Sequence, residues 1–142
     1  MNRSENSVNV EKIGSEKPYL FVLSSTNIPF LVKRVYWINS MIPQQVRGLH
    51  AHKKLEQIAL CVNGEIDFKL TYKNGEQRDF KLISDNRNAL YIPPGVWRIF
   101  KAIKSESSLV VLASEDYQED DYVRNYEEFR SEEHTSELQS RG

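Results

Sequence analysis

Short runs of β-branched and aromatic residues, separated by turn residues, dominate the hydrophobic pattern of this chain. The strongest run is FLVKRVYWI at 30–38. We expect strands at 19–23, 30–38, 57–62, 66–72, 80–83, 89–92, 96–102 and 109–113. Short strands with a turn signal roughly every eight to twelve residues are typical of sandwiches and barrels. The pattern therefore predicts an all-β fold.

Three turn signals separate these runs. Asn63-Gly64 and Asn74-Gly75 each predict a β-hairpin, because this dipeptide favours the tight turns that join antiparallel strands. Pro93-Pro94-Gly95 excludes a helix between two of the runs.

The end of the chain has a different period. Between Asp116 and Phe129, Tyr122, Tyr126 and Phe129 recur at i, i+4 and i+7 among acidic residues. This spacing predicts one short amphipathic C-terminal helix whose aromatic face docks on the barrel.

The two termini are judged separately from the domain. Residues 1–17 are polar and predict a loose arm or a short edge strand. The run RSEEHTSELQS, at 130–140, resembles a common sequencing-library adapter translated in frame, and a natural polar tail is the alternative. We therefore treat 130–142 as non-native and leave it out of the fold argument. The expected domain is 18–129, about 110 residues, which suffices for a single barrel.

Composition excludes several functional classes. The 142 residues carry 19 Lys and Arg against 20 Asp and Glu, a net charge of -1, without the basic excess of a nucleic-acid-binding domain. The apolar runs are too short to span a bilayer, and the polar start of the chain does not resemble a signal peptide. Cys61 is the sole cysteine, which excludes an intrachain disulfide and fits a reducing cytoplasm. We expect a cytoplasmic protein without nucleic-acid or membrane partners.

The most informative chemical feature is His50-Ala51-His52. Residues i and i+2 of a strand face the same side, so both imidazoles would point together. Such pairs bind metals or move protons near neutral pH, although two surface histidines would give the same pattern.

The spacing around the pair resembles the motifs of the cupin superfamily. After His52 come four residues, Gln57, six residues and Gly64, and PPG at 93–95 is followed, after two intervening residues, by Arg98. In cupins a carboxylate and a third histidine stand where this chain has Gln57 and Arg98. The resemblance implies a double-stranded β-helix, or jelly-roll, barrel.

These two substitutions argue against a metal site. A neutral amide and a permanent cation replace two ligands, and Arg98 would repel a divalent ion. The remaining metal hypothesis is a 2-His-1-carboxylate set that uses the adjacent Glu56. We expect neither a metal nor another cofactor, and we interpret the histidines and Arg98 as an acid–base site for an anionic substrate such as a phosphate ester.

A longer series of motifs narrows the resemblance. The segments IPF (28–30), KRVY (33–36), RGLHAHK (47–53), LYIPPGVW (90–97) and DYVRNY (121–126) together resemble the sugar 3,4-ketoisomerase family. The resemblance covers about residues 20–129. It implies an isomerase that moves the keto group of a dTDP-4-keto-6-deoxy-hexose from C4 to C3 through an enediol. It further implies a role in deoxysugar supply for surface polysaccharide such as lipopolysaccharide O-antigen, and a homodimer with exchanged N-terminal strands as one possible form.

The reaction requires a base, an acid and donors to the enediolate oxygens. The candidate catalytic residues are His50 as the base at carbon, His52 as its partner, and Tyr36 as an oxyanion donor. The candidate substrate-binding residues are Arg34, Arg47, Gln57 and Arg98. A glycine at position 48 would let the strand bend so that Arg47 and His50 converge. Tyr36 as a plain barrel aromatic and Arg34 as a surface charge remain the alternatives.

Three other functions remain open at this point. A nucleotide-sugar 3,5-epimerase would also remove protons next to a ketone. A non-catalytic sugar-binding or regulatory cupin would not need the histidines, and a metal-dependent cupin oxygenase would contain tightly bound iron or manganese.

Overall fold

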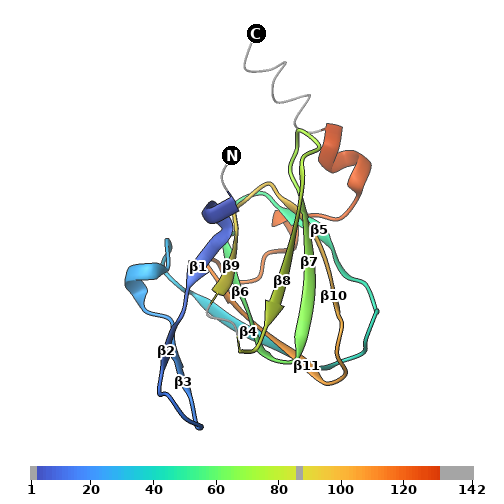
Figure 1. Cartoon of the computed structure of the whole chain (residues 1–142). Coiled ribbons are helices and arrows are strands. Elements are labelled where there is room, and N and C mark those ends of the chain that lie inside the picture. The colour runs from blue at the N-terminus through green and yellow to red at the C-terminus, as the bar shows by residue number, and fades with distance from the viewer. Residues whose placement is uncertain (1–2, 86–87, 132–142) are drawn as a thin grey trace.

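The computed structural model describes residues 3–85 and 88–131, which form two antiparallel sheets facing each other as a barrel (Figure 1). The first sheet contains, in spatial order, β1 (Ser7–Asn9), β9 (Asn88–Ile92), β6 (Gln57–Asn63), β11 (Ser107–Ala113) and β4 (Arg34–Met41). The second contains β12 (Tyr122–Val123), β5 (Arg47–His52), β10 (Trp97–Ala102), β7 (Glu65–Thr71) and β8 (Gln77–Ile83). A small sheet pairs β2 (Glu11–Ile13) with β3 (Leu20–Val22). The predicted all-β jelly-roll barrel is confirmed.

The inner faces of the two large sheets enclose the main core. Alternate residues of each strand point inward, as the period of two requires. The buried members of this core include Ala59, Ile66, Phe68, Leu70, Leu90, Ile92, Leu109 and Val111. The rings of Phe68 and Phe100 stack at 4.8 Å between centroids in this interior.

The N-terminal arm is an edge strand rather than a loose segment. β1 pairs with β9, and Val8 and Val10 pack with Ile58 and Ala89 in a second cluster on the outside of the first sheet. The β2–β3 hairpin that follows projects away from the barrel (Figure 1).

One predicted hairpin is wrong and the other is correct. The strands on either side of Asn74-Gly75, β7 and β8, pair along their length. The strands on either side of Asn63-Gly64 do not pair with each other, because β6 lies in the first sheet and β7 in the second. At this crossing Gly64 has a φ of +83°, and a Cβ there would lie 2.2 Å from the Ser107 Oγ. A close approach of two strands therefore requires this glycine.

The predicted C-terminal helix is largely wrong in extent. Residues 116–118 are irregular, Glu119–Asp121 form a 3-10 turn, and Tyr122–Val123 form strand β12 against β5. The helix occupies only 126–131 of the described residues. The Asp121 carboxylate accepts hydrogen bonds from the backbone N–H groups of Lys54 and Leu55, which holds the segment against β5 in extended form.

The docking of that short helix agrees with the prediction. Phe129 is fully buried, and its ring lies 5.7 Å from the ring of Trp97, with Tyr126 5.3 Å from Trp97. Residues 132–142, most of the stretch predicted to be non-native, lie outside the described residues. Within the described residues, none of the helices has the length and apolar character needed to cross a membrane.

The crossing at Gly64 generates a stability prediction. We expect Gly64→Ala to lower the free energy of unfolding by about 3 kcal/mol, from a positive φ and an overpacked contact. The matched control is Gly75→Ala, which also has a positive φ (+94°) but has only the flexible end of Arg130 nearby, at 3.2 Å. We expect this control to lose about 1 kcal/mol. Urea denaturation followed by circular dichroism measures both, and equal losses would contradict the close approach.

Candidate active site

The two histidines of the HxH motif lie together on the inner face of β5. Their rings meet edge to face, with 4.8 Å between centroids and 87° between planes. Arg98 on β10 is the cross-strand partner of His50, so its side chain shares the same face. The two imidazoles therefore point to the same face of the strand, as their i, i+2 spacing predicts, and Arg98 lies on that face.

A β-bulge at Gly48 and Leu49 shapes the start of this strand. The register of β5 against β10 shifts between His50, which opposes Arg98, and Gly48, which opposes Ile99. The extra residue lets Arg47, opposite Phe100, share a face with His50 despite the odd spacing. The bend predicted at this glycine is therefore present, and the Arg47 side chain is exposed.

His50 is held as a neutral ring with one free nitrogen. Its Nδ1 lies 2.9 Å from the Gly48 carbonyl oxygen, which can only accept, so Nδ1 carries the proton and Nε2 keeps its lone pair. Burial, followed by the nearby Arg98 cation, lowers the pKa of His50 to about 4. His50 is therefore available as a base at neutral pH.

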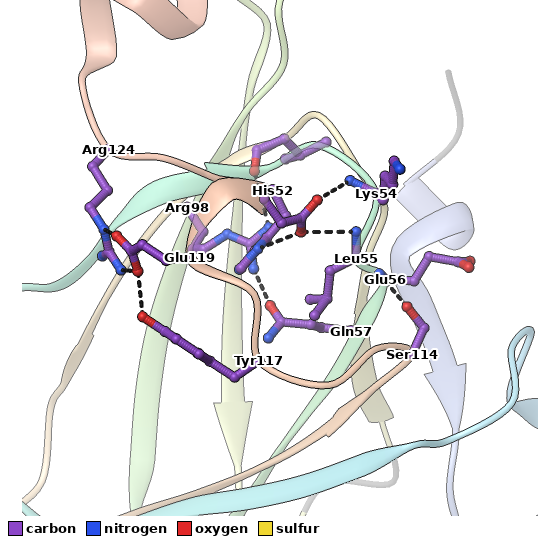
Figure 2. A network of polar contacts seen from close by, with 12 residues as sticks. His52, Lys54, Leu55, Glu56, Gln57, Arg98, Ser114, Tyr117, Glu119 and Arg124 are labelled. Carbon is purple, nitrogen blue, oxygen red and sulfur yellow. Dashed lines mark hydrogen bonds and ion pairs between the residues drawn. The ribbon is translucent and has the colours of Figure 1, made fainter.

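His52 lies deeper, with 1% of its surface exposed. Its Nδ1 is 3.1 Å from the Asp121 carboxylate, which fixes this tautomer as well (Figure 2). Burial, then the Arg98 cation and His50, lowers the pKa of His52. Its Nε2 is buried without a hydrogen-bond partner among the described residues.

A chain of polar contacts runs from Arg98 through Gln57 to Tyr36. The Arg98 guanidinium donates to the Gln57 Oε1, and the Gln57 Nε2 donates to the Tyr36 hydroxyl at 2.9 Å. Since the Tyr36 oxygen accepts this bond, its own proton is free to be donated elsewhere. Burial raises the pKa of Tyr36, which keeps the phenol protonated.

Arg98 is placed differently from the expected phosphate-binding mouth. It is 2% exposed, and a second guanidinium nitrogen donates to the Val96 carbonyl at 3.2 Å. Burial lowers its pKa to about 10, so it remains a cation at neutral pH. Arg98 therefore acts from inside the barrel, where its charge reaches His50 and Gln57 rather than a surface ligand.

The donor set does not fit a cupin metal ion. Gln57 and Arg98 occupy the carboxylate and third-histidine positions and bond to each other. Glu56 accepts a hydrogen bond from the Tyr91 hydroxyl at 2.7 Å. Its backbone N–H donates to Ser114, and its side chain points away from His52 (Figure 2), so it does not join the histidines. Within residues 3–85 and 88–131, no group of three His, Cys, Asp or Glu side chains is placed to hold a metal.

The predicted site residues fall into three groups. Tyr36, His50, Gln57 and Arg98 line one narrow cavity of about 30 Å³ inside the barrel. His52 lies behind His50, against Asp121. Arg34 and Arg47 lie outside the lining, with the Arg34 guanidinium 5.4 Å from the Tyr36 ring centroid. The structure thus brings together four of the seven predicted residues in the cavity and two, His52 and Arg34, through neighbours, whereas Arg47 is exposed and does not line the cavity.

Two further residues at the histidines were not predicted as site residues. Asp121 anchors His52, and the Tyr122 ring lies 5.0 Å from the His50 ring and 4.3 Å from the His52 ring. The DYVRNY motif contained the signal, but the aromatic spacing led to its interpretation as a helix. A strand here places Asp121 and Tyr122 beside β5 instead.

Comparison with known proteins identifies the family. The family model described as FdtA: WxcM-like, C-terminal, matches residues 4–134. The TDP-4-oxo-6-deoxy-alpha-D-glucose-3,4-oxoisomerase of Aneurinibacillus thermoaerophilus is 36% identical over 124 residues, covering 87% of this chain and 88% of that protein.

Solved structures agree with this match. A double mutant of the QdtA 3,4-ketoisomerase from Thermoanaerobacterium thermosaccharolyticum, in complex with TDP, is similar with a TM-score of 0.82 and 35% identity, covering 89% of this chain and 91% of that one. The WlaRB TDP-quinovose 3,4-ketoisomerase from Campylobacter jejuni has a TM-score of 0.80 and 34% identity, covering 88% and 95%. By sequence match over most of its length and by fold, this chain belongs to the WxcM-like FdtA family of sugar 3,4-ketoisomerases.

Proposed function

We propose that this protein is an isomerase that moves the keto group of a dTDP-4-keto-6-deoxy-hexose from C4 to C3 by acid–base catalysis. The observation that carries the proposal is that His50 and Tyr36 line the same cavity. His50 is neutral with a free Nε2, and Tyr36 is a protonated phenol, so a base and an acid share one cavity. The relatives at 34–36% identity are TDP-sugar 3,4-ketoisomerases.

In the proposed transfer of the carbon-bound proton, one residue, His50, acts at both C3 and C4. His50 Nε2 removes the proton from C3 of the 4-keto sugar, which leaves an enediolate across C3 and C4. The imidazolium so formed returns the proton to C4. Gly48 supports both states, because its carbonyl oxygen accepts from Nδ1 throughout.

The oxygen step moves one proton from O3 to O4, so that C3 becomes the ketone and C4 the alcohol. The Tyr36 hydroxyl is the proposed donor to the developing oxyanion, and Gln57 strengthens it by donating to the phenol oxygen. The buried Arg98 cation stabilises the negative enediolate in a site that largely excludes water. His52, fixed by Asp121, is the proposed proton-relay partner.

Substrate binding is assigned to three arginines and one glutamine in and around the cavity. Arg34 beside Tyr36 and the exposed Arg47 are proposed to bind the diphosphate, and Gln57 and Arg98 to contact the sugar. No metal or other cofactor takes part in this scheme. We place the enzyme in the cytoplasm, in the supply of a deoxysugar for surface polysaccharide such as lipopolysaccharide O-antigen, a compartment where the lone Cys61 stays reduced.

The alternative functions receive less support. The epimerases among the structural matches are only 17% identical, a likeness of fold alone. A non-catalytic cupin gives no reason for the fixed tautomers of His50 and His52. An oxygenase would need metal ligands that Gln57 and Arg98 do not supply.

We further propose that the protein is a homodimer. Val35 and Trp37 on the outer face of β4 are 49% and 63% exposed, and their cross-strand partners on β11 are Leu112 and Val110. The projecting β2–β3 hairpin adds exposed Leu20. Neighbouring exposed apolar side chains, such as Val35 and Trp37 on one face of β4, are typical of a protein–protein interface. A second copy is the proposed occupant.

The first test of the reaction replaces the proposed base. Incubation of the protein with dTDP-4-keto-6-deoxyglucose in D2O with a chelator, followed by proton NMR, should give the 3-keto sugar. We expect His50→Asn to lower kcat about 1000-fold, because it removes the general base. Absence of 3-keto product with the unmodified protein would contradict the function, loss of activity with chelator would contradict the metal-free scheme, and deuterium at C5 would indicate epimerase activity.

The pH dependence of kcat/KM tests the state of His50. A base acts only when unprotonated, so a pKa of about 4 predicts undiminished kcat/KM from pH 7 down to about 5 and a fall near pH 4. We expect Arg98→Gln, measured where circular dichroism shows a folded protein, to move the midpoint upward, because it removes a cation that disfavours protonation. A fall centred near the ordinary histidine pKa of about 6.5 in the unmodified protein would contradict this assignment.

The dimer is tested by changing its proposed interface. We expect Trp37→Asp to convert the dimer to a monomer, since a charge would have to be buried in an apolar contact. Ile42→Asp, at a residue 62% exposed but beyond the end of β4, is the control and should leave the dimer intact. Light scattering after size-exclusion chromatography gives the mass, and a monomeric unmodified protein or a dimeric Trp37→Asp variant would contradict the proposal.

A further inference from the structure

The ring of Tyr122 contacts both histidines of the site, and the reaction scheme above assigns it no step. Tyr122 on β12 is the cross-strand partner of His52 on β5. Its ring lies 4.3 Å from the His52 ring and 5.0 Å from the His50 ring, inclined by 59° and 51°. Two imidazoles that meet each other edge to face therefore share one aromatic neighbour.

A compact polar cluster from the same segment holds Tyr122 in place. The Arg124 guanidinium lies 4.1 Å over the Tyr122 ring, in a cation–π contact. Arg124 also donates from Nε and from a terminal nitrogen to the two carboxylate oxygens of Glu119, both at 2.9 Å. The Tyr117 hydroxyl donates to Glu119 (Figure 2). The Tyr117 ring lies 5.7 Å from the Tyr122 ring.

The geometry of this cluster is better suited to orientation than to global stability. Exposed ion pairs contribute little to folding stability, and both Glu119 and Arg124 are more than half exposed. A two-pronged contact between a guanidinium and a carboxylate nevertheless fixes direction, because both groups are planar. The pair keeps the guanidinium over the Tyr122 ring.

The charges that face His50 come from two elements. The charge of Arg98 acts on His50 from β10, and the charges of Glu119, just before β12, and Arg124, just after it, act on His50 from the C-terminal segment. Glu119 and Arg124 have opposite charges and form a pair, so their combined field at the imidazole is small. The pair therefore acts on His50 mainly through the ring it holds.

We propose that Tyr122, held by the Glu119–Arg124 pair, is a positioning residue that sets the orientation of the His50 and His52 imidazoles. The kinetic consequence of this role rests on the proposed isomerase function, whereas its effect on the imidazoles does not. Misplacement of a reacting group by about 1 Å can cost about 100-fold in rate, so orientation by one ring is a sufficient cause of a large effect.

The experiment compares paired variants at two positions. Tyr122→Phe keeps the ring and Tyr122→Leu removes it, while Arg124→Lys keeps the charge and Arg124→Gln removes it. Lys33→Gln is the matched control, because Lys33 forms an exposed ion pair with Glu115, at 3.2 Å. Each protein, checked for folding by circular dichroism, is assayed for kcat and KM, and its imidazole nitrogens are observed by NMR after labelling with 15N-histidine.

We expect Tyr122→Leu to lower kcat by about 10- to 100-fold with little change in KM, and to shift the imidazole nitrogen resonances, because both rings lose the aromatic neighbour that orients them. Tyr122→Phe and Lys33→Gln should match the unmodified protein. Arg124→Gln should lower kcat less than Tyr122→Leu does, and Arg124→Lys should lower kcat less than Arg124→Gln.

Two outcomes would overturn the proposal. Unchanged kcat and unchanged imidazole spectra in Tyr122→Leu would reduce Tyr122 to a structural residue. Equal losses in Tyr122→Phe and Tyr122→Leu would mean that the hydroxyl acts directly. If the unmodified protein fails to isomerise the sugar, the proposed function is lost, and the imidazole spectra of Tyr122→Leu still decide whether the ring orients the histidines.

Discussion

The guanidinium of Arg98 is buried in the barrel and bonds to no carboxylate among the described residues, and this is the constraint on which the rest of the site depends. Burial of a cation is costly, and Arg98 offsets part of this cost by donating to the Gln57 amide oxygen and the Val96 carbonyl, while its Nε has no hydrogen-bond partner among the described residues. This arrangement orients Gln57, so that its amide nitrogen is directed at Tyr36. The same charge disfavours protonation of both histidines and is incompatible with a metal ion between them.

The C-terminal segment completes what the barrel begins. Asp121 accepts from two backbone N–H groups of the loop after β5 and from His52, so one carboxylate joins the segment, the loop and the imidazole. Tyr122 then lies against both histidines, and Phe129 anchors the short helix on Trp97. Residues of the C-terminal segment, distant in sequence, thereby cover the histidines on the side away from β10.

The errors in the sequence prediction have definite physical causes. The aromatic spacing from Tyr122 to Phe129 is compatible with a helix. Hydrogen bonds from the loop after β5 to Asp121 instead stabilise a strand where the first turn of that helix was predicted. Asn63-Gly64 has the composition of a hairpin, but the strands it joins belong to different sheets. Local composition describes a turn well and says little about where the next strand pairs.

The sequence by itself determined the all-β class, the inward-facing histidine pair, and the replacement of two metal-ligand positions by Gln57 and Arg98. These features depend on residue type and on short spacings, because side chains two positions apart in a strand point to the same face of the sheet. Only the tertiary structure decided that Arg98 lies inside the barrel rather than at its mouth, and that Asp121 and Tyr122 belong to the site. Those facts arise from contacts across 41 to 69 positions of sequence, and such contacts are set by the packing of the two sheets.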